Sequence, residues 1–246
     1  GIEVPNIENT PVKMYELLKD VSPSEPPLQF ALGKDLMGNV IFCDLAKMPH
    51  LLIAGATGAG KSVALNAIIT TILLRTTPEE VRLLLIDPKK VEFNSFANAP
   101  HLMTDIINEP TQANTALMRI VEIMDDRYRD FAKINVKNIK AYNEYKTVNP
   151  DADLPNMELI VVIIDELADL MIVAGKEVEQ SIQRITQLAR AAGIHLIVAT
   201  QRPSTDVITG IIKSNIPSRI SFAVSSGIDS RTILDTVGAE RLLGNG

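Results

Sequence analysis

The sequence predicts an α/β fold with a mostly parallel central sheet and helices on both faces. After Pro49, short aliphatic runs alternate with longer stretches of helical period, and each run is short enough to form one buried strand. A glycine-rich segment joins the first run to a helical stretch, as in the phosphate loop of such sheets. Ligands of these sheets bind at the carboxyl ends of the strands. We expect strands at residues 51–55, 82–87, 159–165, 194–200 and 219–225.

The remaining segments complete this scheme. Helices are expected at residues 111–134, 137–146 and 177–192, and a polar loop at 149–156 returns the chain to the sheet. Upstream, SPSEPP at residues 22–27 is the clearest linker.

The chain is expected to divide at this linker. Residues 1–27 form an N-terminal segment with one or two helical turns, and residues 28–246 form the main domain. Two apolar runs within residues 28–49 look like paired strands, a small β apron that leads into the domain. Neither end carries a cap or tail signal, so we expect a domain truncated at both ends.

Composition narrows the class of protein. The chain has 246 residues, 46% hydrophobic and 22% charged, which excludes disordered, collagenous and coiled-coil chains. One cysteine and three scattered histidines leave no disulfide and no ligand cluster, and the longest aliphatic run, LIVVII, cannot span a bilayer. We therefore expect a soluble intracellular domain. Its net charge of −6 is uneven: residues 181–246 hold seven Lys and Arg against four Asp and Glu, so a polyanion would prefer this quarter.

The glycine-rich segment GATGAGKS matches the pattern G-x-x-x-x-G-K-[ST]. Its glycines let backbone N–H groups point into one concavity, and the following helix N-terminus adds partial positive charge. Lys61 is expected to reach the β and γ phosphates of a nucleotide, and Ser62 to bind Mg²⁺. The alternative is a flexible glycine-rich turn, which the flanking strand and helix disfavour. The predicted nucleotide-binding residues are Gly55, Ala56, Thr57, Gly58, Ala59, Gly60, Lys61, Ser62 and Val63.

An acidic pair ends the most hydrophobic predicted strand. Buried strands place carboxylates only at the tip, because an unpaired carboxylate inside the sheet is costly. Asp165 is expected to bind Mg²⁺ directly or through water, and Glu166 to polarise a water for attack on the γ phosphate. Two adjacent carboxylates favour nucleotide hydrolysis over phosphoryl transfer to a small acceptor. The alternative is a surface pair that begins the next helix.

Other polar residues are candidates for the nucleotide site, and the sequence supports them to different degrees. Gln201 and Thr200 end a strand where a hydrogen bond to a γ phosphate is possible, whereas Asp87 fits a turn before Pro88 as well as a site role. In the helix at 177–192, the rotation of 100° per residue places Arg184 and Arg190 on opposite exposed flanks, and periodicity does not decide which reaches a neighbour's nucleotide.

Isolated histidines in apolar or turn contexts are expected to be structural: His50, His101 and His195.

Several motifs together resemble the motor domain of the FtsK/SpoIIIE family of bacterial DNA translocases. They are GATGAGKS, IDPK, VVIIDELADL, ARAAGIHLIVATQRPSTDVITG, IKSNIPSRISFAVSS and DSRTILD. The resemblance covers nearly all of residues 49–246, and the long motif at 189–210 is far more specific than the phosphate loop. It implies a RecA-like ATPase that uses ATP and Mg²⁺ and forms a homo-hexameric ring around double-stranded DNA, moving it in chromosome segregation at division or sporulation. It also implies a cytoplasmic domain of a protein anchored in the inner membrane through segments outside this chain.

The resemblance also assigns roles by position. The acidic pair and Lys61 are then catalytic, Gln201 is the sensor, and Arg190 is the arginine that acts on the neighbouring subunit. Its DNA loops match residues 202–213 and 225–231, where the candidate contacts are Arg202, Lys213 and Arg231. The alternative for each is a solvated charge or a partner at a helix end. Two positions depart from the family pattern: Gly227 stands where a Lys is common, and Lys90 where a Met follows DPK.

Two other functions are compatible with the motifs. One is a secretion or conjugation ATPase of the same superfamily that moves protein or a relaxase-bound strand. The other is a nucleotide-binding switch with little turnover, against which Glu166 argues, because a switch has no need of a water-activating carboxylate.

Overall fold

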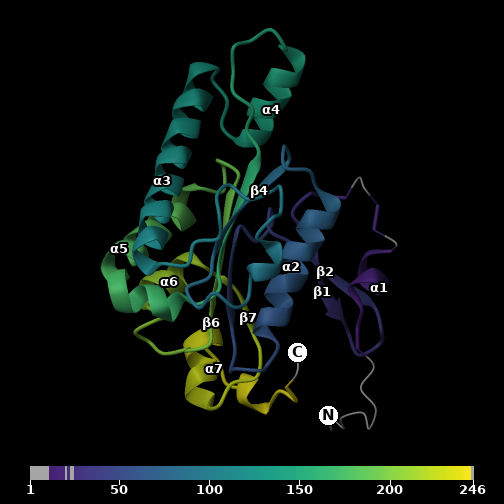
Figure 1. Ribbon diagram of the computed structural model, residues 1–246, viewed down its shortest axis with the longest axis vertical. Helices are drawn as coiled ribbons and strands as arrows, with labels where there is room; N and C mark the ends of the chain where they lie inside the picture. Colours follow the sequence, from purple (N-terminus) through teal and green to yellow (C-terminus); the bar gives the residue numbers. More distant parts are fainter. Residues whose placement is uncertain (1–10, 20, 23–24, 245–246) are drawn as a thin grey trace.

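A five-stranded parallel sheet forms the centre of the protein (Figure 1). The computed structural model describes residues 11–19, 21–22 and 25–244. The strand order is β4–β5–β6–β3–β7, and every neighbouring pair is parallel, as predicted. The strands are β3 (His50–Ala54), β4 (Val81–Ile86), β5 (Leu159–Ile164), β6 (Ile194–Thr200) and β7 (Ser218–Ser221).

Alternate residues of each strand enter two separate cores. On β5, for example, Val162 and Ile164 pack with helices α3 (Pro110–Lys133) and α5 (Leu167–Leu188), whereas Val161 and Ile163 pack with α2 (Lys61–Arg75). Both sheet faces are covered, which explains the continuous aliphatic runs (Figure 1). The helices are α2 (Lys61–Arg75), α3 (Pro110–Lys133), α4 (Ile139–Val148), α5 (Leu167–Leu188), α6 (Gly210–Asn215) and α7 (Gly227–Leu234), with short 3₁₀ turns at Asn94–Phe96 and Ala239–Arg241.

The predicted β apron is an antiparallel hairpin of β1 (Gln29–Lys34) and β2 (Val40–Asp44). Leu28, Phe30 and Leu45 at its base are fully buried in the core under α2. Arg75 at the end of α2 donates hydrogen bonds to the carbonyl oxygens of Glu25 and Gln29. The apron is therefore packed on the same face of the sheet as α2.

The N-terminal predictions are tested only in part. Helix α1 (Met14–Leu18) supplies the expected helical turns. Residues 1–10, and residues 23–24 of the expected linker, lie outside the described part of the chain. No helix within the described residues is both long and apolar enough to cross a bilayer.

Helix α5 corrects the predicted helix at 177–192. It begins at Leu167, because Glu166 is its N-cap residue, and it bends at Ala174, whose φ and ψ of −145° and 43° are non-helical. It ends at Leu188, and a turn to Gly193 follows. Gly193 has φ of +72°, and a Cβ there would lie 2.6 Å from Cδ1 of Ile139, so only glycine fits this turn.

Two smaller differences lie near the C-terminus. Strand β7 ends at Ser221, four residues before the predicted end, and α6 was not expected. Beyond Ser221 the chain leaves the sheet but stays against β3, since Phe222 N donates to Ala54 O over 2.8 Å.

Candidate active site

The phosphate loop connects β3 to α2 at the carboxyl edge of the sheet. Gly58 and Gly60 have φ of +80° and +116°, a region that residues with a Cβ rarely adopt. Gly60 is the N-cap of α2 and places no side chain over the first N–H groups of the helix, which stay open to an anion. A Cβ on Gly55 would lie 2.6 Å from Phe222 Cβ, so this glycine is required for the close approach of the chain after β7.

The lysine of this loop is paired with the acidic strand end. Lys61 Nζ lies 2.6 Å from Asp165 Oδ1 and donates to the Asp165 carbonyl oxygen over 2.8 Å. Both side chains are buried. Val63, one turn into α2, is exposed, and Ser62 is half-buried. Two of the three N–H groups of the Lys61 ammonium are engaged by Asp165, which leaves one for another acceptor.

Asp165 retains an oxygen available to a cation. Burial raises the pKa of its carboxyl, while the adjacent Lys61 ammonium acts to lower it. Its second oxygen, Oδ2, is buried without a hydrogen-bond partner. Carboxylate and hydroxyl oxygens are ligands that Mg²⁺ accepts, so the residue types of Asp165 and Ser62 suit this ion. Asp87 accepts hydrogen bonds at Oδ2 from the backbone N–H groups of Glu92 and Phe93, which supports a role in the turn, while its Oδ1 is also buried without a partner among the described residues.

The Glu166 carboxylate accepts hydrogen bonds from several protein groups. It is fully buried, and the Thr200 hydroxyl donates to Oε1 over 2.5 Å. The backbone N–H of Gln201 donates to Oε2 over 3.1 Å, and that of Ala168 to Oε1 over 3.4 Å. Lys89 Nζ lies 3.2 Å from Oε2. This last contact was missed from the sequence, although the register that pairs β4 with β5 brings their ends together.

The expected sensor contacts the phosphate loop directly. Thr57 Oγ1 donates to Gln201 Oε1 over 2.9 Å, across the neighbouring tips of β3 and β6. Gln201 thus joins the loop that would hold the phosphates to the carboxylate at the end of β5.

The two arginines near the end of α5 are both exposed, as expected, but only Arg184 lies on the helix. Arg184 pairs with Asp125 over 2.7 Å. Arg190 lies in the turn before β6 and donates weakly, over 3.4 Å, to Ala46 O before β3. It is therefore at the amino edge of the sheet, opposite to the phosphate loop of its own chain.

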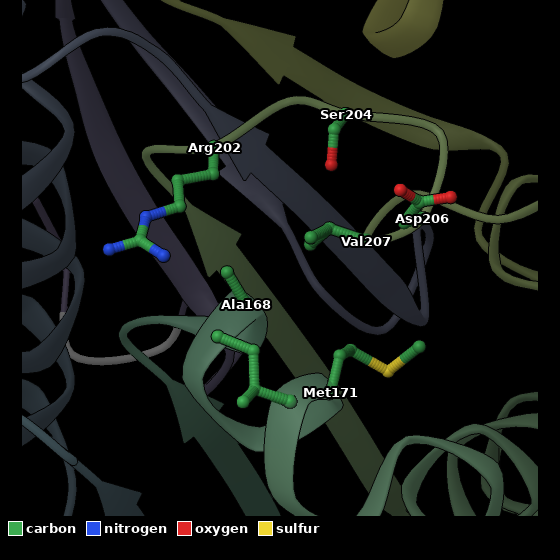
Figure 2. Close-up of a pocket in the computed structure, with 7 residues that line it drawn as sticks. Ala168, Met171, Arg202, Ser204, Asp206 and Val207 are labelled. Carbon is green, nitrogen blue, oxygen red and sulfur yellow. The ribbon is translucent and has the colours of Figure 1, made fainter.

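The candidate DNA residues have unequal surroundings. Arg202 and Arg231 are exposed. Lys213, in contrast, is paired with Asp235, which also pairs with Arg219. The loop that carries Arg202 and Asp206 faces Ala168 and Met171 of α5 (Figure 2). The hollow that these residues line has a volume of about 270 Å³.

The three histidines are buried and hydrogen-bonded. His195 Nδ1 donates to Pro49 O over 3.1 Å, and His50 Nδ1 accepts from Leu196 N. Burial lowers the pKa of His195 to about 4 and that of His50 to about 3. His101 contacts the carbonyl oxygen of Thr76.

The profile of the FtsK/SpoIIIE family matches residues 18–205. The chain belongs to this family. It is 58% identical to the DNA translocase FtsK of Staphylococcus aureus strain Mu50 over 249 aligned positions, covering all of this chain and 32% of that protein. The chain therefore spans about a third of the length of this curated relative.

Solved structures agree with the family's fold. The pCW3 conjugation coupling protein TcpA, solved with ATPγS, is 30% identical with a TM-score of 0.74, over 88% of this chain and 60% of TcpA. The type VII secretion ATPase EccC of Thermomonospora curvata has a TM-score of 0.80 at 22% identity, over 95% of this chain and 30% of EccC. At this identity EccC supports the fold alone, which is the RecA-like α/β fold of P-loop ATPases.

Proposed function

We propose that this chain is the motor domain of an ATP-driven translocase of double-stranded DNA that acts in chromosome segregation at division or sporulation. The single observation that carries hydrolysis is the position of Glu166, held beside Asp165 and joined through Gln201 to the phosphate loop. Family membership and the identity to FtsK carry the choice of DNA.

Each residue of the site then has a distinct role. The N–H groups of the phosphate loop and Lys61 bind the phosphates of ATP. Glu166 accepts a proton from the attacking water, and the donors on its Oε1 fix the direction in which it does so. Gln201 is the proposed sensor of the γ phosphate, a role that the hydrogen bond from Thr57 of the phosphate loop to its side chain supports.

Ser62 and Asp165 are the residues that would hold Mg²⁺. When bound, this ion would supply positive charge against the negative charge that develops on the phosphate oxygens.

The position of Arg190 supports assembly into a ring. At the amino edge of the sheet it is remote from its own phosphate loop, so it is placed to act on the site of an adjacent subunit. We infer a homo-hexameric ring around the duplex. We also infer that this domain is cytoplasmic and is held at the inner membrane by segments outside this chain.

The second candidate is a conjugation or secretion ATPase, which the similarity to TcpA favours. The rate of ATP hydrolysis with long duplex DNA, single-stranded DNA or an unfolded polypeptide separates the two. Stimulation by duplex alone is expected. Stimulation only by polypeptide or single strand would reject the translocase, and ATP binding without turnover under every condition would favour a switch.

A further inference from the structure

Glu166 has every side-chain oxygen engaged by a protein donor. Its Oε1 accepts from Thr200 and from Ala168 N, and its Oε2 accepts from Gln201 N and from Lys89. A carboxylate that activates water needs a lone pair directed at that water. The arrangement in this structure is therefore a resting one, in which at least one donor must leave before Glu166 acts as a base.

Lys89 is the donor that can leave. Thr200 ends β6 and Ala168 lies in the first turn of α5, and both are buried, whereas Gln201 is the first residue of the loop after β6. Lys89 lies in the loop after β4, its side chain is 35% exposed, and Glu166 is its partner over 3.2 Å. A lysine has a long flexible stem, and the partly exposed ammonium of Lys89 can be solvated by water when it moves away from Glu166.

The candidate DNA loop is connected to the same carboxylate. Arg202 N donates to Thr200 Oγ1 over 3.0 Å, and Thr200 in turn donates to Glu166. The adjacent N–H, of Gln201, binds Glu166 directly. A displacement of the loop after β6 thus shifts Glu166 relative to Lys89, which comes from a different strand.

We propose that Lys89 is a positioning residue that restrains Glu166 and suppresses ATP hydrolysis until duplex DNA is bound. Release of Lys89 frees Oε2 for water, while Thr200 keeps Oε1 oriented. The inference rests on the proposed function, because it assigns a regulator to the same hydrolytic site.

Lys89→Met tests the restraint, and Lys90→Met is its matched control. Lys90 is the next residue of the same loop but pairs at the surface with Glu109. Lys89→Met should raise kcat without DNA by roughly 2- to 10-fold, leave the affinity for ATP unchanged and lower the stimulation by duplex by the same factor. Lys89→Arg should restore the stimulation, and Lys90→Met should behave as wild type. The added turnover should vanish in Lys89→Met/Glu166→Gln, since it passes through Glu166.

A second readout needs no turnover. A lysine-selective acylating reagent, followed by mass spectrometry, should modify Lys89 of the wild-type protein faster when duplex and a non-hydrolysable ATP analogue are both present, with Lys90 as the internal reference. This measurement also tests whether Lys89 is released if the Lys89→Met variant does not fold.

The outcomes separate the inference from the proposed function. If wild type hydrolyses no ATP with duplex, the proposed function fails. If wild type is stimulated and Lys89→Met has unchanged or lower kcat at normal ATP affinity, only the restraint is overturned. Equal labelling of Lys89 in all states overturns it as well.

Discussion

Thr200 Oγ1 donates a hydrogen bond of 2.5 Å to Glu166 Oε1 from the adjacent strand tip. Thr200→Val keeps the shape but removes the hydroxyl, so a buried carboxylate oxygen loses its shortest bond. We expect kcat to fall roughly 10- to 100-fold while the dissociation constant for ATP stays within about twofold. Steady-state kinetics and equilibrium binding measure both. Thr200→Ser should retain most activity, and a folded Thr200→Val protein with normal kcat would contradict the assigned contact.

Lys61 and Asp165 form a buried pair whose loss has two effects. Lys61→Ala should abolish measurable ATP binding and also lower the free energy of unfolding by about 3 kcal/mol, because Asp165 then lacks its counter-charge. Asp165→Asn added to Lys61→Ala should recover much of the stability but none of the binding. Denaturant unfolding and nucleotide titration separate the two effects. Equal stability of the single and double variants would mean that the pair is not coupled.

The parts of the fold that the sequence predicts best are those in which consecutive residues carry the signal. Strand β6 was predicted residue for residue at Ile194–Thr200, because strands buried on both faces leave uninterrupted aliphatic runs. Helix α5 was predicted too short at its start, because its N-cap, Glu166, belongs to the acidic motif and the bend at Ala174 interrupts the helical period.

The site contacts between distant segments were less predictable. The bonds from Lys89 to Glu166 and from Thr57 to Gln201 depend on which strand ends are neighbours in the sheet. No local sequence pattern predicts the strand order β4–β5–β6–β3–β7. The sequence likewise offers Lys213 as a candidate DNA contact, whereas the fold brings Asp235 against it. Local motifs thus predict the residue types at the site, and tertiary structure decides their partners.

Stability should fall in mild acid because His195 is buried as the neutral form. Its pKa is about 4 in the folded state and about 6.5 when unfolded, so between these values only the unfolded state binds the proton. The free energy of unfolding should therefore decrease as pH falls from 6.5 to 4, by roughly 1 to 3 kcal/mol for this residue. The raised pKa of Asp165 acts to increase the free energy of unfolding as pH falls, which is the opposite direction. The contribution of His195 is therefore measured by comparing the wild type with a variant of this residue.

His195→Asn keeps a donor for Pro49 O but does not titrate. Denaturant unfolding at a series of pH values should show a shallower loss for this variant than for wild type. Parallel curves for the two proteins would show that His195 is not the group responsible.

Arg190 should act only between subunits. Arg190→Ala is expected to lower hydrolysis by roughly 10³-fold or more, as for arginines that act in trans in other NTPases. Mixing it with Lys61→Ala should restore some activity, because mixed rings contain an intact loop facing an intact arginine. Arg184→Ala, which loses only a surface pair with Asp125, should be mild. No recovery in mixtures shown to co-assemble would contradict action in trans.

Arg202 and Arg231 should bind DNA phosphates more than Lys213 does. Both arginines are exposed, whereas Lys213 is held by Asp235. Each phosphate that a side chain neutralises contributes about −0.9 to the slope of log K against log salt, so Arg202→Ala/Arg231→Ala should make the slope less steep by up to about 2. Affinity should fall equally for duplexes of unrelated sequence, because phosphate contacts carry no base information.

The same double variant should keep ATP hydrolysis without DNA near the wild-type rate, since neither side chain contacts the nucleotide site, but should lose its stimulation by duplex. Lys213→Ala is the matched control: it should change the salt slope less than either arginine, because Asp235 already neutralises this charge. Binding isotherms at several salt concentrations, measured together with ATPase rates, give both quantities. If Lys213→Ala alone removes stimulation while the arginine variant retains it, the pair with Asp235 opens when DNA binds, and the path of the duplex runs over α6 instead of over the loop after β6.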